Sequence, residues 1–106
     1  MVIPPHMTGI ALHCPFARLV AVAARVWPDM TCTVEFGDPG KRKLGSTTFY
    51  GDGSPPTVVV RATLPLEQAV GVLAHELAHV AVPDDARHGR RWKAAHQRLF
   101  DAWEAP

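Results

Sequence analysis

The sequence predicts a single α+β domain over residues 1–106, with an N-terminal helix, a small three-stranded, mainly antiparallel sheet and two further helices. Length is the first indication, because a chain of 106 residues has room for one core of ordinary size. Composition is the second, since 47% hydrophobic and 20% charged residues are typical of globular proteins. The third is hydrophobic periodicity, which is helical in three stretches and alternates in three others.

The first helix and the strands are predicted from this periodicity and from the residues that interrupt it. Residues 1–8 have no usable period, so we expect a poorly ordered lead-in. A helix is predicted from Pro15 to Trp27, where Pro28 ends it. Three strands are predicted at Thr31–Phe36, Leu44–Tyr50 and Thr57–Ala62. The last two strands are joined by a glycine-rich and proline-rich loop at residues 51–56, which is longer than a two-residue hairpin turn but is consistent with antiparallel pairing.

Two more helices follow the strands. The second begins at Thr63-Leu64-Pro65, where proline is tolerated in the first turn, and Pro83 ends it. Its apolar stripe is expected to pack against the sheet and comprises Leu66, Val70, Leu73, Leu77 and Val80. The third helix is predicted from Gly89 to Glu104, with Trp92, Ala95, Leu99 and Ala102 or Trp103 facing inward.

Charge and cysteine content exclude several classes of protein. A formal net charge of +1 does not demand a polyanionic partner, and the basic residues 41–43 are expected to form a solvated turn. Cys14 and Cys32 lack the spacing of a disulfide scaffold or a four-thiolate metal site, so both are predicted to be reduced. The N-terminal residues lack the features of a signal peptide or a membrane span, which predicts a cytoplasmic protein.

The segment HELAH at residues 75–79 has the HExxH pattern of zinc hydrolases. His75 and His79 lie one helical turn apart and nearly opposite the apolar stripe, so both imidazoles can bind one ion. Glu76 is placed to act on a water molecule without binding the metal. Zinc lowers the pKa of such a water, and the carboxylate then serves as general base and returns the proton to the leaving amine. The motif therefore predicts amide hydrolysis.

The alternative interpretation is an amphipathic helix whose exposed face happens to carry two histidines and a glutamate. Two observations weaken it. Ala74 and Ala78 flank the histidines with little bulk, and another histidine, His88, follows soon after the helix. An HExxH segment inside a predicted helix favours the metal site.

A catalytic zinc ion usually has three protein ligands and one open position, so a third ligand is expected. The metzincin spacing would need a glycine and a ligand at the positions of Val82 and Asp85. A glutamate from a later helix, as in thermolysin-like enzymes, would have to be Glu104, in a terminal turn that is expected to fray. His88 is better placed, because the chain turns at Pro83 and returns to the start of the third predicted helix.

The HELAH segment is followed by a second motif, His-Gly-x-x-Trp, at residues 88–92. Together the two motifs resemble the SprT-like and WLM metallopeptidases of the zincin class, and the resemblance extends from Ala62 to Phe100. It implies a minimal zincin-like fold in which His75, His79 and His88 bind Zn²⁺ and Glu76 is the general base.

The same resemblance implies a peptide or protein substrate. It implies that an edge strand, either Leu44–Tyr50 or Thr57–Ala62, binds extended peptide by β-augmentation. The zinc ribbon and DNA-binding segments of longer SprT-like proteins are not seen in this sequence, so we expect no direct contact with nucleic acid, and a monomer. The main alternative is a catalytically silent zincin-like module that binds metal or a protein partner, because so short a chain leaves little material for a deep cleft. A structural zinc that fastens residues 83–87 to the helix is a third possibility.

Several other residues are weaker candidates. His96 could hydrogen-bond near the site, and Tyr50, Arg90 or Arg91 could stabilise an oxyanion. Asp84 or Asp85 could accept the N–H of a ligand histidine. A further possible ligand group near the N-terminus comprises His6, His13 and Cys14. The tryptophans are expected to be core aromatics, not a stacking platform for nucleic acid.

Overall fold

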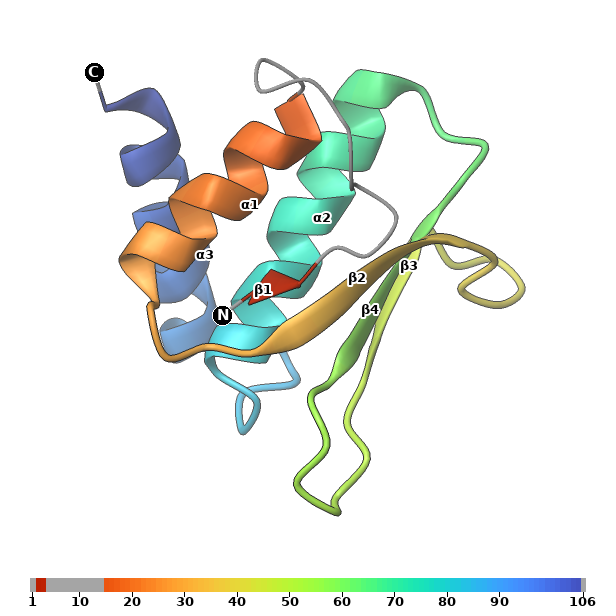
Figure 1. The fold of residues 1–106 in the computed structure, drawn as a ribbon, viewed down its shortest axis with the longest axis horizontal. Coiled ribbons are helices and arrows are strands. Elements are labelled where there is room, and N and C mark those ends of the chain that lie inside the picture. Colours follow the sequence, from red (N-terminus) through yellow and green to blue (C-terminus); the bar gives the residue numbers. More distant parts are fainter. Residues whose placement is uncertain (1, 4–14, 106) are drawn as a thin grey trace.

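A computed structural model of the chain describes residues 2–3 and 15–105. Within them the elements are β1 (Val2–Ile3), α1 (Pro15–Val26), β2 (Cys32–Gly37), β3 (Gly45–Thr48), β4 (Thr57–Arg61), α2 (Leu66–Ala81) and α3 (Arg90–Glu104). The three helices lie together on one side and the sheet packs against α2 (Figure 1). The predicted α+β class and the order of helix, sheet, HExxH helix and C-terminal helix are therefore confirmed.

The sheet is mixed, so the prediction of a mainly antiparallel sheet was wrong in this respect. Its strand order is β1-β2-β4-β3. The predicted antiparallel pairing of β3 with β4 is present, but β4 runs parallel to β2. The chain leaves β2, crosses to the outer edge as β3 and returns between the two as β4. The reason lies in composition: TVVVR of β4 is the more apolar strand and takes the buried centre, whereas GSTT of β3 tolerates an edge.

The N-terminal lead-in was also predicted incorrectly in part. Val2 and Ile3 form the short strand β1, which pairs in parallel with β2. Residues 1 and 4–8 lie outside the described residues. Valine and isoleucine are β-branched residue types, which are enriched in strands.

The core lies between the sheet and the helices. Val34, Val58 and Val60 of the sheet are fully buried, as are Leu73 and Leu77 of α2. Apolar side chains of the other two helices complete this core, among them Phe16, Leu19, Val20 and Ala23 of α1 and Leu99 of α3. The expected inward stripes are confirmed except at Leu66, which is 50% exposed. It is the first residue of α2, and the buried face of that helix begins one turn later at Ala69.

The remaining features of composition are as expected where the structure describes them. Cys32 is a free, buried thiol, and burial raises the pKa of this thiol to about 11, whereas Cys14 lies outside the described residues. Residues 41–43 are exposed in a turn. No helix of the described part of the chain is both long and apolar enough to cross a membrane.

Candidate metal centre

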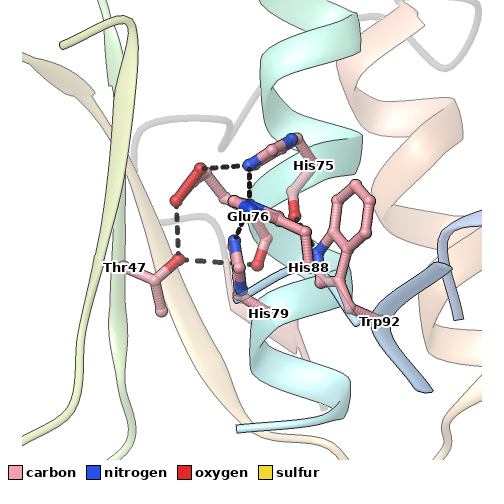
Figure 2. Close-up of polar contacts among 6 residues, drawn as sticks. All are labelled: Thr47, His75, Glu76, His79, His88 and Trp92. Atoms are coloured by element: carbon pink, nitrogen blue, oxygen red, sulfur yellow. Dashed lines mark hydrogen bonds and ion pairs between the residues drawn. The ribbon is translucent and has the colours of Figure 1, made fainter. Parts of the chain in front are cut away.

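Helix α2 presents His75 and His79 on the same side. The two residues are one turn apart, and their ring centroids lie 5.0 Å apart. Figure 2 shows both rings pointing to a common point between α2 and the loop that follows it. The helical periodicity of the sequence is sufficient to explain this part of the site.

His88 approaches the same point from the loop between α2 and α3. Its Nε2 lies 2.9 Å from Nε2 of His79 and 2.9 Å from Nε2 of His75. The backbone of His88 has a φ of 59°, a left-handed conformation that is uncommon for residues other than glycine and clusters at functional sites. This backbone conformation turns the imidazole back towards α2.

The donor set fits a metal cation. The ligand atoms of the three histidines all lie within 4.8 Å of one another. A neutral imidazole carries either one hydrogen or one lone pair at Nε2, so Nε2 of His88 cannot donate to one neighbour and accept from the other. A single cation between the three nitrogens would accept a lone pair from each of them, which is how neutral imidazoles bind zinc.

The electrostatics of the cluster favour the neutral form of two of its imidazoles, those of His75 and His79. Burial, together with the proximity of His79, His88 and His96, lowers the pKa of His75 to about 4. Burial, followed by the proximity of His88, also lowers the pKa of His79. At neutral pH both rings therefore have a lone pair free for a metal, and binding requires no loss of a proton from them.

Glu76 is buried beside the histidines although it carries a carboxylate. It is 7% exposed, and Oε2 lies 4.0 Å from Nε2 of His75. Burial raises the pKa of its carboxyl group, while a hydrogen bond from Thr47 acts in the opposite direction. A carboxyl group with a raised pKa at the edge of a histidine cluster accepts a proton more readily than an exposed glutamate does.

Thr47 of β3 is the residue that the sequence did not reveal. Its hydroxyl donates to Oε1 of Glu76 at 3.0 Å, and the carbonyl oxygen of Glu76 lies 3.4 Å from the same hydroxyl (Figure 2). This contact requires β3 to lie very close to α2. Gly45 permits the approach, because a Cβ at Gly45 would stand 2.5 Å from Cγ1 of Val72. No sequence pattern indicates so short a distance between a strand and a helix.

Replacing Thr47 by valine should destabilise the metal-free protein by about 1–3 kcal/mol, because the buried carboxylate of Glu76 loses its hydrogen-bond donor. Urea denaturation followed by circular dichroism would measure this change. Thr48→Val is the matched control, since Thr48 is exposed on the neighbouring position of the same strand. Equal stability of the two variants would show that the hydrogen bond to Glu76 does not contribute to the free energy of unfolding.

Trp92 forms one wall of the histidine cluster. The indole is buried and its ring centroid lies 4.7 Å from that of His88, 4.8 Å from that of His75 and 5.6 Å from that of His79. Its Nε1 donates to the carbonyl oxygen of His75 at 3.3 Å. Trp92 is therefore an inward aromatic, as predicted, that also packs against all three histidines.

Asp85 stabilises the start of α3 and does not contact a histidine ring. Its carboxylate accepts hydrogen bonds from the backbone N–H of Gly89 at 2.9 Å and of Trp92 at 3.0 Å. These two bonds hold the pKa of Asp85 below its ordinary value. The proposed contact between Asp85 and a ligand histidine was therefore wrong, because the free N–H groups of the helix end compete for the carboxylate.

The other weaker candidates lie at different distances from the cluster. His96 stacks on Trp92 with a centroid distance of 4.7 Å and lies 6.4 Å from the ring of His75. Arg91 forms an ion pair with Asp84, so neither residue is directed to the histidines. The hydroxyl of Tyr50 donates to Oγ1 of Thr57 at 2.8 Å. Arg90 is exposed as the first residue of α3, and His6, His13 and Cys14 lie outside the described residues.

The fold and the cluster define a class of protein: a small α+β domain whose central helix carries two histidines and a buried glutamate, completed by a third histidine from the next loop. Comparisons with protein-family models, with curated proteins and with solved structures find no match to this chain.

Proposed function

We propose that this chain is a zinc-dependent metallopeptidase of the SprT-like type. The observation that carries the proposal is the convergence of three histidine Nε2 atoms beside the buried carboxylate of Glu76. Neutral imidazoles are preferred zinc ligands, and three of them leave a fourth position open. A structural zinc site would usually be closed by four protein ligands, so the three-histidine set favours catalysis.

The residues divide the work of peptide hydrolysis. His75, His79 and His88 would hold the zinc ion, which when bound lowers the pKa of water and polarises a carbonyl group. Glu76 accepts the proton from the attacking water and later delivers it to the nitrogen of the leaving amine. Thr47 keeps the carboxylate of Glu76 in place through its hydrogen bond.

The substrate that suits this arrangement is an extended peptide. β3 is the outer strand beside α2, whereas β4 is paired on both sides. Of the two edge strands expected from the sequence, Thr57–Ala62 is therefore excluded, and β3 within Leu44–Tyr50 remains. A peptide that adds to the free edge of β3 would run alongside α2, where Glu76 and the histidines lie.

We also propose that the protein acts in the cytoplasm.

The test combines metal analysis with a hydrolysis assay. Protein supplied with zinc should contain about one zinc ion per chain by elemental analysis, as a single three-histidine site requires. It should cleave members of a mixed peptide library detected by mass spectrometry. A chelator should abolish cleavage, and added zinc should restore it. A protein that is saturated with zinc but cleaves no peptide in the library would contradict the proposal.

A further inference from the structure

A cavity of about 290 Å³ lies between the three helices. Its wall is largely apolar and includes Leu19 of α1 and Phe100 and Trp103 of α3. Phe100 is 40% exposed, and an exposed aromatic ring on the wall of an apolar cavity is typical of a binding site. The volume is just below the usual range for ligand pockets, about 300–1,000 Å³, so the cavity suits one aromatic or aliphatic side chain better than a large cofactor.

A second cavity, of about 500 Å³, lies on the metal side of α2. His75 and Glu76 contribute to its wall together with Leu44 and Val72. Gly71 lines this cavity and also the cavity between the helices. Gly71 therefore lies on the exposed ridge of α2 that separates the two.

The presence of glycine at this position has no packing explanation. A glycine inside a helix is less stable than alanine, and a Cβ at Gly71 would meet no atom within 4 Å. The absence of a side chain instead keeps the ridge low. A chain bound at the metal side can cross α2 at this point.

The length of such a crossing is set by the helix. An α-helix with its side chains is about 10–12 Å across, and an extended peptide rises about 3.3 Å per residue. A crossing therefore needs about three to four residues. Glu67 contributes the one charged side chain of the cavity wall, and within the described residues no ion pair neutralises it. A bound peptide with a basic residue close to the cavity is therefore favoured over one with an acidic residue there.

From these observations we infer that the cavity between the helices binds an aromatic or large aliphatic side chain of the polypeptide substrate. The side chain belongs to a residue about three to four positions from the cleaved bond, and the substrate crosses α2 over Gly71. This inference rests on the proposed peptidase function, because it assigns the substrate of the same site.

Matched peptides test the inference on the zinc-loaded protein. The two peptides of a pair have the same sequence around a bond that the protein cleaves, except that one residue is phenylalanine in one peptide and serine in the other. In the first series this residue is the fourth before the cleaved bond, and in the second series it is the fourth after it. In one of the two series the phenylalanine peptide should have a kcat/KM about tenfold higher, through a lower KM, as expected for burial of one aromatic side chain. Both peptides carry a lysine next to this residue, as a partner for Glu67, and replacing that lysine by glutamate should reduce the advantage of the phenylalanine peptide.

Variants of the protein show whether the preference for the phenylalanine peptide arises in the cavity between the helices. The ratio of kcat/KM for the phenylalanine peptide to kcat/KM for the serine peptide should fall to about two or less in Phe100→Ala and in Gly71→Leu. Phe100→Ala removes the aromatic wall of the cavity, and Gly71→Leu raises the ridge that the substrate crosses. Gly71→Ala should retain most of the ratio. Leu66→Ala is the matched control, because Leu66 is an exposed apolar residue of α2 outside both cavities. A ratio that stays at the wild-type value in Phe100→Ala would overturn the inference.

A binding measurement separates this inference from the peptidase proposal. N-acetyl-phenylalanine amide, followed by NMR, should shift the indole N–H resonance of Trp103 but not that of Trp27, and Phe100→Ala should lose the shift. Cleavage of both peptides at equal rates, or no shift at Trp103, overturns the substrate cavity alone. Absence of cleavage of every peptide overturns the peptidase function, and the substrate assignment with it.

Discussion

Replacing Glu76 by glutamine is expected to lower peptide hydrolysis by about two to four orders of magnitude while the zinc content stays at the wild-type level. Glutamine is almost the same size as glutamate and can still accept the hydrogen bond from Thr47. It cannot accept a proton from the attacking water. The three histidines are unchanged, so metal binding and hydrolysis should separate in this variant.

Glu104→Gln is the matched control for this experiment. Glu104 is exposed at the end of α3 and is the other glutamate that the sequence offered downstream of the motif. Hydrolysis should be unaffected in this variant. Full activity of Glu76→Gln would show that another group serves as base, whereas equal inactivity of wild type and variant would favour a catalytically silent metal-binding module.

Replacing His88 by alanine should remove most of the bound zinc and most of the stabilisation that zinc gives. Two histidines of one helix remain, which is one ligand fewer than a catalytic site usually needs. A metal that binds only the folded protein stabilises it by about 4 kcal/mol at a thousandfold excess over its dissociation constant. The melting temperature of the wild type should therefore rise with zinc, and that of His88→Ala should change little.

His96→Ala distinguishes loss of a ligand from general damage to the aromatic cluster. His96 stacks on Trp92, but the three Nε2 atoms that converge belong to other residues. This variant should keep its zinc by elemental analysis. Zinc retained at full occupancy by His88→Ala would place the third ligand elsewhere. Zinc that raises the melting temperature of the wild type without any hydrolysis would favour the structural role considered from the sequence.

The sequence was sufficient for features that depend on neighbouring residues along the chain. The ends of α1 and α2 lie within two residues of a proline, because proline fixes φ and lacks the N–H that a helix interior requires; these prolines are Pro15, Pro28, Pro65 and Pro83. The spacing of HELAH brings two imidazoles to one side of a helix, because the helical period also acts between residues that are close in sequence. The proximity of His88 was also predictable, because only a short loop separates it from α2.

The tertiary structure decided what depends on contacts between distant segments. The apolar residues of β4 suit the centre of the sheet, but the parallel pairing of β4 with β2 depends on how all the strands pack in the core. The hydrogen bond from Thr47 to Glu76 joins residues that are 29 positions apart, and it depends on the distance between β3 and α2. Local periodicity and proline geometry act over a few residues, whereas strand order and such contacts depend on how the whole core packs.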